Sequence, residues 1–131
     1  MAQTQDILTL DDIKLLVDTF YTRVRADKML GPVFEERIED RWPKHLDTMY
    51  RFWQTVLLEQ YTYQGRPGAK HITLPVGVEH FERWLVLFFT TIDELFSGEK
   101  ATEAKWRAEK MADMFVSKIA FYQKNNGRGI L

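Results

Sequence analysis

The sequence of 131 residues contains no cysteine, only three histidines and no long apolar run. The missing cysteines exclude disulfide bonds, thiolate chemistry and cysteine-based zinc sites. No apolar stretch reaches the roughly 18 residues that a membrane-spanning helix needs, and the first residues lack the character of a signal peptide. The net charge of −1 comes from mixed charges, which gives no indication of a nucleic-acid partner. These absences predict a cytoplasmic protein with no membrane or nucleic-acid partner.

Apolar and aromatic side chains are plentiful by contrast. Hydrophobic residues make up 45% of the chain and charged residues 28%, which is the balance of a globular protein with one core. Aromatic residues reach 14%, and large flat side chains suit the walls of a pocket for a large flat ligand. The length and the lack of a linker predict a single domain over residues 1–131, with flexible ends at about 1–8 and 124–131.

Apolar residues recur at helical spacing in four segments, and no segment alternates as a strand would. Thr9 is placed to cap the first helix, which stops near the Gly31-Pro32 pair. A short helical turn follows that pair. Asp40 is expected to cap the second helix, with Pro43 in its first turn. The fold class predicted by this pattern is all-α.

The stretch QYTYQGRPGAKHITLP, residues 60–75, has no helical spacing and holds two glycines and two prolines. The third helix is expected after it, and the fourth over about residues 101–122. A loop this long inside a compact domain is usually functional or disordered. This one contains Tyr63, Arg66 and Lys70, which are either solvated or contacts for carboxylates at the edge of a buried cofactor.

The loop also contains His71, which is either a surface or hydrogen-bonded histidine or a metal ligand. Zinc is disfavoured because His45, His71 and His80 show no paired spacing. A single histidine suffices where a cofactor brings the metal's other ligands, as haem does. His80 lies among charged neighbours and is predicted to be a surface residue.

Two further polar residues fall on inward helix faces. His45 is in register with the apolar face of the second helix, and Tyr21 follows the stripe of the first. Each has an ordinary alternative as a core residue with a hydrogen-bond partner. Together they are the donors that a diatomic ligand on iron needs. Trp53 and Trp84 have core filling as their ordinary role.

These residues resemble the truncated, or two-over-two, haemoglobins. The resemblance rests on FYTRVRADKMLGPVF, HLDTMYRFW and YQGRPGAKHITLP followed by HFERWL, and it extends from about Asp11 to Tyr122. His45, Trp53 and the Leu74-Pro75 pair resemble the third group of that family. The stretch PVGVEHF departs from the family pattern, and its Gly77 predicts a loose start to the third helix.

The resemblance implies a two-over-two helical sandwich around haem b (iron protoporphyrin IX). His71 would be the proximal iron ligand, Tyr21 and Trp84 would donate hydrogen bonds to the distal ligand, and His45 would be a gate or third donor. The residues that would wall the haem are Phe20, Phe34, Met49, Phe52, Phe81, Leu85 and Phe88. The residues that would meet its propionates are Tyr63, Arg66 and Lys70.

Several functions are compatible with such a pocket. The first is binding of dioxygen, nitric oxide or carbon monoxide at ferrous iron. The alternative is a peroxidase-like or nitric-oxide-oxidising enzyme, and turnover would require an unidentified reductase. A sensor ranks last because the chain shows no partner domain. A helical bundle without a cofactor would leave the long loop and the inward histidines unexplained.

Overall fold

The computed structural model of the chain describes residues 4–63, 65 and 75–124. These residues form five helices and no strand. The helices are α1 (Leu10–Ala26), α2 (Gly31–Ile38), α3 (Trp42–Leu58), α5 (Val78–Leu95) and α6 (Glu99–Lys124). The all-α prediction is confirmed, and the expected short helical turn after the first helix is α2.

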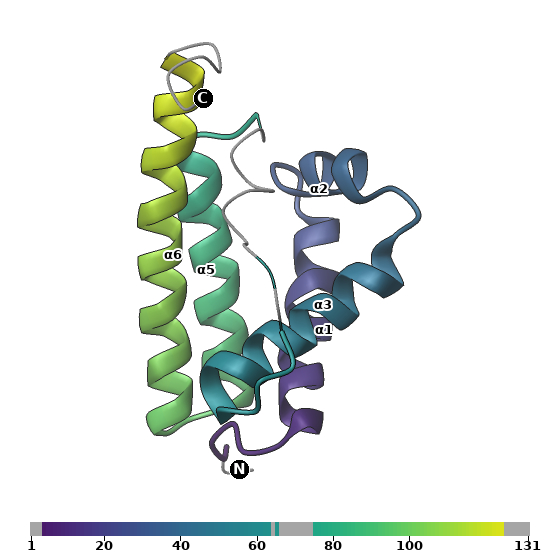
Figure 1. Cartoon of the computed structure of the whole chain (residues 1–131), viewed down its shortest axis with the longest axis vertical. Coiled ribbons are helices and arrows are strands. Elements are labelled where there is room, and N and C mark those ends of the chain that lie inside the picture. The colour runs from purple at the N-terminus through teal and green to yellow at the C-terminus, as the bar shows by residue number, and fades with distance from the viewer. Residues whose placement is uncertain (1–3, 64, 66–74, 125–131) are drawn as a thin grey trace.

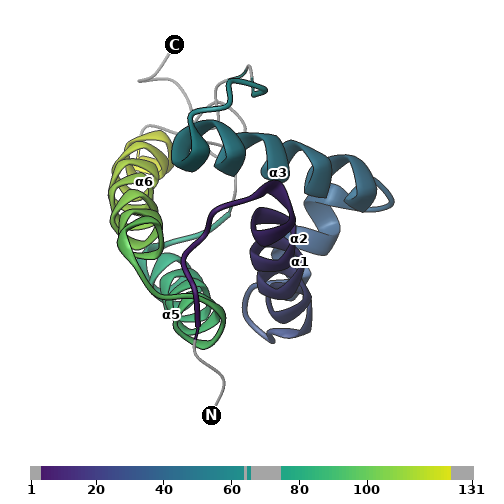
Figure 2. The ribbon, with the colours of Figure 1, turned by 90° about the horizontal axis from the view of Figure 1, so that it is seen from below.

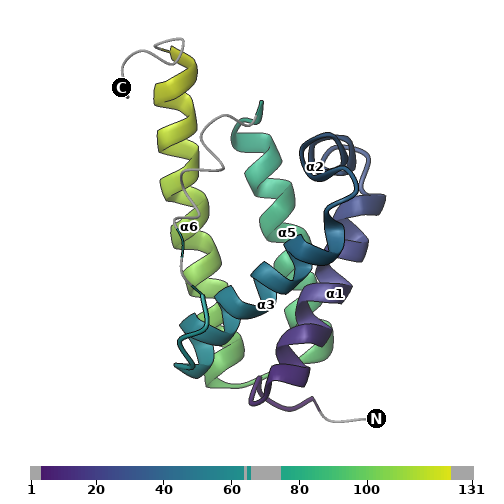
Figure 3. The same cartoon turned by 45° about the vertical axis from the view of Figure 1, so that its right-hand side comes forward.

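The helices pack as two pairs, one over the other. α5 and α6 lie side by side and antiparallel (Figure 1), and α1 packs against α3. α1 also packs on α5, which joins the two pairs. Figure 2 shows α3 reaching from α6 across to α1 and α2, and Figure 3 shows its diagonal course beside α5. This arrangement is the two-over-two sandwich that the sequence predicted.

The start of α1 is fixed as expected. Thr9 Oγ1 accepts a hydrogen bond from the Asp12 N–H at 3.2 Å, and Asp12 Oδ2 accepts one from the Thr9 N–H at 3.0 Å. This reciprocal capping box satisfies two backbone donors that would otherwise lack helical partners. The apolar stripe of α1 then packs into the core, where Ile13, Leu16 and Val24 are fully buried.

The start of α3 differs from the prediction. Arg41, rather than Asp40, is the N-cap, while Pro43 does lie in the first turn. The Arg41 side chain donates to the carbonyl oxygens of Ile38 and Arg37 at 3.2 and 2.6 Å. These bonds satisfy the last carbonyls of α2.

The segment before α1 makes specific contacts with the start of α6. The Asp6 carboxylate accepts the Lys100 and Ala101 N–H groups, both at 2.9 Å, and so caps α6. Ile7 is fully buried beside it. Gly98, at φ +133°, lies against Asp6, where a Cβ would come within 2.6 Å of the carboxyl carbon.

Candidate functional site

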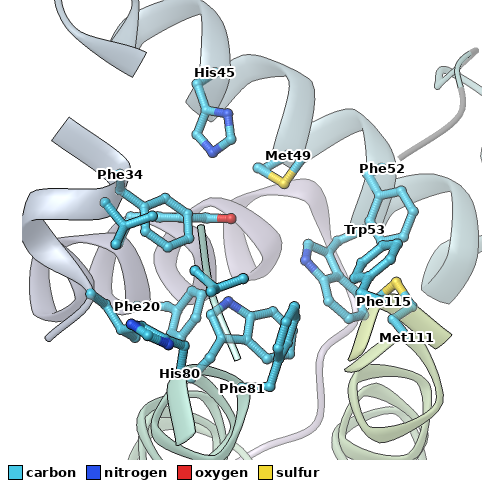
Figure 4. Close-up of a pocket in the computed structure, with 15 residues that line it drawn as sticks. Phe20, Phe34, His45, Met49, Phe52, Trp53, His80, Phe81, Met111 and Phe115 are labelled. Atoms are coloured by element: carbon cyan, nitrogen blue, oxygen red, sulfur yellow. The ribbon is translucent and has the colours of Figure 1, made fainter. Parts of the chain in front are cut away.

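A cavity lies where the two helix pairs meet. Its empty space is about 860 Å³, a figure that includes the open mouth. All five helices contribute side chains to it (Figure 4). The residues that line it are Phe20, Tyr21, Leu30, Val33, Phe34, His45, Met49, Phe52, Trp53, Val76, His80, Phe81, Trp84, Met111 and Phe115.

Tyr21 and His45 meet on one side of this cavity. Their rings lie edge to face with centroids 5.1 Å apart, and Tyr21 comes from α1 while His45 comes from α3. The Tyr21 side chain is 7% exposed, and its burial raises the pKa of the phenol well above the ordinary value. Tyr21 therefore keeps its proton and remains a hydrogen-bond donor. The Nε2 atom of His45 is also buried.

Trp84 brings a third polar side chain to the cavity, from α5. Its ring meets the Phe20 ring edge to face at 5.6 Å and stacks parallel on Phe88 at the same distance. Tyr21, His45 and Trp84, the three residues predicted to meet a ligand, thus line one cavity from three different helices. We call these three residues the polar trio.

Most of the expected wall residues also line the cavity. Phe20, Phe34, Met49, Phe52 and Phe81 do so, whereas Leu85 and Phe88 are not among the described lining residues. Phe88 is 1% exposed and is covered by Trp53, Trp84 and Phe20, whose rings lie 5.1 to 5.6 Å away. Phe88 therefore supports the wall from behind. Trp53 is 4% exposed and fills the core as expected, and it also lines the cavity.

His80 differs from its prediction as a surface residue. Its side chain is 22% exposed and lines the cavity from the first turn of α5 (Figure 4). The Gly77 N–H donates to His80 Nδ1 at 3.0 Å, which caps α5 and replaces the loose start expected there. Because a ring nitrogen that accepts an N–H carries no proton, the proton of an uncharged imidazole in this arrangement lies on Nε2.

Lining residues that the sequence did not single out are Leu30, Val33, Val76, Met111 and Phe115. Met111 and Phe115 lie on the last helix, where helical spacing cannot tell a core position from a cavity wall. Leu30 and Val76 lie outside the helices, where periodicity gives no signal. Val76 is held by the Gln123 side chain, which donates to its carbonyl oxygen at 3.1 Å.

The structure describes only part of the predicted loop. His71, Arg66 and Lys70 lie outside the described residues. Tyr63 is half-buried, and its ring meets Phe52 edge to face at 5.3 Å behind the cavity lining. Thr55 Oγ1 accepts the Thr62 and Tyr63 N–H groups at 3.1 and 3.0 Å, which fixes the start of the loop against α3. The predicted contacts of these residues with propionates stay predictions.

The cavity fits a large, flat and mainly apolar cofactor. Aromatic, aliphatic and methionine side chains form most of its wall, and Figure 4 shows His45 and Met49 extending into it from α3, opposite Phe81 on α5. Such a wall favours burial of an apolar ring system, while the polar trio supplies the few directed contacts that a ligand site needs. None of the described helices is long and apolar enough to cross a membrane.

Comparisons with known proteins agree on one family. The model of the bacterial-like globin family matches residues 6–118. The group 3 truncated hemoglobin ctb of Campylobacter jejuni subsp. jejuni is 34% identical over 116 residues, which cover 86% of this chain and 91% of that protein. The crystal structure of group III truncated hemoglobin from Campylobacter jejuni matches with a TM-score of 0.80 and 31% identity, covering 89% of this chain and 95% of that one.

Proposed function

Because the chain belongs to the bacterial-like globin family, we propose that its cavity holds haem b and that ferrous iron there binds dioxygen, nitric oxide or carbon monoxide. The chain is a haem-binding globin of the truncated type, most similar to the third group.

The observation that carries the proposal is the shared location of Tyr21, His45 and Trp84 in an otherwise apolar cavity. When bound, ferrous haem supplies an iron atom that takes up a diatomic gas and leaves partial negative charge on the outer atom of dioxygen. Donors of the polar trio favour that charge most strongly in a cavity shielded from water. A hydrogen bond to a charged group contributes about 1.5–3 kcal/mol, so this pocket suits retention of dioxygen rather than its rapid release.

His71 is the proposed protein ligand of the iron. The support is its place in AKHITLP, the family resemblance and the chemistry of the other histidines. His80 is the less suited candidate, because its Nδ1 already accepts the Gly77 N–H at the start of α5. His45 lies beside Tyr21, on the side of the cavity assigned to the gaseous ligand.

The proposed contacts to the cofactor are of two kinds, those to the haem ring and those to its propionates. Phe34, Met49, Phe52, Phe81 and Trp84 would contact the haem ring, with Phe88 supporting Trp84 from behind. Tyr63, Arg66 and Lys70 would meet the propionates, because guanidinium, ammonium and phenol groups donate to carboxylates.

We also infer a cytoplasmic location.

The visible absorption spectrum of the purified protein with one equivalent of haem tests this proposal. We expect a Soret band that shifts on reduction and again on addition of carbon monoxide. A spectrum that equals free haem in buffer, unchanged by the protein, contradicts the proposal. The ferric spectrum also reports whether His45 or water occupies the sixth position on the iron.

A second function, a peroxidase-like or nitric-oxide-oxidising activity, is favoured by the pairing of an imidazole with a phenol at the cavity. His45 can accept a proton and return it, and Tyr21 remains a donor because burial raises its pKa. Both properties assist cleavage of an O–O bond. Such turnover needs an external reductase or other electron donor. Steady consumption of hydrogen peroxide with a reducing substrate, lost in His45→Leu, would support this function over storage.

A further inference from the structure

Trp42 lies directly behind two members of the polar trio. It is the first residue of α3, is 5% exposed and is not among the described residues that line the cavity. Its ring meets the Tyr21 ring edge to face at 5.9 Å and the His45 ring at 5.6 Å. Because Tyr21 and His45 also meet each other at 5.1 Å, the three rings support one another in a closed triangle.

The outer side of Trp42 is held by an ion pair. The Trp42 Nε1–H donates to Glu35 Oε2 at 3.3 Å, and Arg25 Nε donates to Glu35 Oε1 at 2.7 Å. The Arg25 guanidinium also lies over the Trp42 ring, 4.3 Å from its centre. The hydrogen bond from Arg25, with that from Trp42, lowers the pKa of Glu35 despite the opposing effect of desolvation. We call Arg25, Glu35 and Trp42 the clamp.

The clamp connects the three helices that carry or flank the Tyr21–His45 pair. Arg25 lies one turn after Tyr21 on α1, Glu35 lies on α2, and Trp42 lies one turn before His45 on α3. An exposed ion pair contributes little stability by itself. The contacts of Arg25 and Glu35 with the Trp42 ring restrict the tilt of that ring. The Trp42 ring in turn limits the rotation of the Tyr21 and His45 side chains that it touches.

We propose that Trp42 is a positioning residue for the distal ligand site, and that the Arg25–Glu35 ion pair on the surface sets the geometry of Tyr21 and His45 through it. This inference rests on the proposed function, because it assumes that Tyr21 and His45 face the gaseous ligand. Neither clamp charge touches that ligand. A hydrogen bond weakens steeply when its angle departs from linear, so a small rotation of either ring lowers the affinity for dioxygen.

The test compares Trp42→Phe, which removes the indole N–H and part of the ring area, with Glu35→Gln, which retains the shape and removes the charge. Two quantities are measured on the haem-loaded protein: the dissociation rate of dioxygen and the C–O stretching frequency of the carbon monoxide complex. The frequency responds to the electric field of nearby donors, which a loss of stability alone does not change. The matched control is Glu103→Gln, because Glu103 accepts from Arg107 Nε at 2.7 Å on α6, in a pair of the same geometry.

We expect dioxygen release to become roughly fivefold faster in Trp42→Phe, the factor that corresponds to one weakened hydrogen bond. The C–O band should shift or split in the same variant. Glu35→Gln should change both quantities in the same direction by less, and Glu103→Gln should change neither. If Trp42→Phe does not fold, Glu35→Gln and Arg25→Gln provide the test, because they retain Trp42.

The inference is overturned if the clamp variants keep the wild-type dissociation rate of dioxygen and the wild-type C–O frequency. This holds even if the variants lose thermal stability. Tyr21→Phe separates this failure from a failure of the proposed function. If Tyr21→Phe speeds dioxygen release and the clamp variants do not, the positioning role alone is wrong. If Tyr21→Phe does not change dioxygen release either, the assignment of Tyr21 to the distal ligand site is wrong as well.

Discussion

Tyr21 and His45 meet edge to face at 5.1 Å across the interface of α1 and α3, at the wall of the cavity. The two side chains come from helices joined by α2, so the pair depends on the packing of all three. Burial holds Tyr21 in its protonated form by raising the pKa of the phenol. The arrangement therefore presents a phenol and an imidazole at one side of the cavity.

The first prediction concerns the iron ligand. His71→Gly should abolish stable haem binding, and added imidazole should restore it, because the small ligand can occupy the vacated position. His80→Gly is the matched control and should retain haem, since His80 Nδ1 already accepts the Gly77 N–H. Haem retention is measured from the Soret band after gel filtration. A normal Soret band in His71→Gly, together with loss of the band in His80→Gly, would show that His80 and not His71 is the iron ligand.

The second prediction concerns the loop. Arg66→Ala combined with Lys70→Ala should speed haem transfer to an acceptor globin, because both cations would attract the propionates. The effect should be modest, since an exposed ion pair contributes about 0–1 kcal/mol. Absorbance change on mixing with the acceptor measures the rate. Lys110→Ala on α6 is the control. An unchanged rate of haem transfer in the double variant would indicate that Arg66 and Lys70 are solvated and do not contact the propionates.

The third prediction uses the link between α1 and α5. The Asp27 side chain is 7% exposed and accepts from Arg83 Nε at 2.7 Å and from the Leu30 and Met29 N–H groups at 3.0 and 3.1 Å. Desolvation alone would raise the pKa of Asp27, but these hydrogen bonds lower it overall. A carboxyl group with a lowered pKa stabilises the fold above its unfolded pKa, and this contribution disappears as the pH falls.

Asp27→Asn should therefore lower the free energy of unfolding at pH 7 by about 1 kcal/mol, discounted because Arg83 is half-exposed. The difference from the wild type should shrink as the pH falls from about 4 through the lowered pKa of the folded protein, because the carboxyl group is protonated first in the unfolded state and then in the folded state. Urea unfolding at a series of pH values measures it. Asp47→Asn, in an exposed pair with Arg51 at 2.9 Å, should show little difference at any pH. A constant difference for Asp27→Asn across the pH range would contradict the electrostatic explanation.

Helical spacing and local caps were enough to predict much of this fold. Thr9 caps α1 as expected because its capping box involves only neighbouring residues. Asp40 was wrongly predicted as the cap of α3, where Arg41 takes that position and bonds back to α2, a contact that depends on how the turn closes. The contact of Asp6 with the start of α6 was not predicted, since Asp6 caps a helix that begins more than ninety residues later.

The candidate site shows the same limit. Tyr21 and His45 could be paired from their inward helix faces, because each is on the buried stripe of its helix. Phe88 lies behind the wall and Trp53 lies at the cavity because their rings stack on each other. The spacing of apolar residues along the sequence does not determine such stacking. His80 was assigned to the surface from its charged neighbours, yet a helix start at Gly77 turns its ring toward the cavity. Tertiary packing decided the positions of Phe88 and Trp53, and a local helix cap decided that of His80.

The central claim is that Tyr21 and Trp84 hold dioxygen by hydrogen bonds, and the dissociation rates of dioxygen and carbon monoxide from wild type, Tyr21→Phe and Trp84→Phe test it most directly. Loss of one donor should speed dioxygen release by about one to two powers of ten, since a hydrogen bond to a charged group contributes about 1.5–3 kcal/mol. Carbon monoxide carries less negative charge on its outer atom, so its release should change much less and serves as the control within each variant. His45→Leu should mainly alter ligand entry. Wild-type dioxygen release in both Tyr21→Phe and Trp84→Phe would contradict the claim, and slower release would identify His45 as the stronger donor.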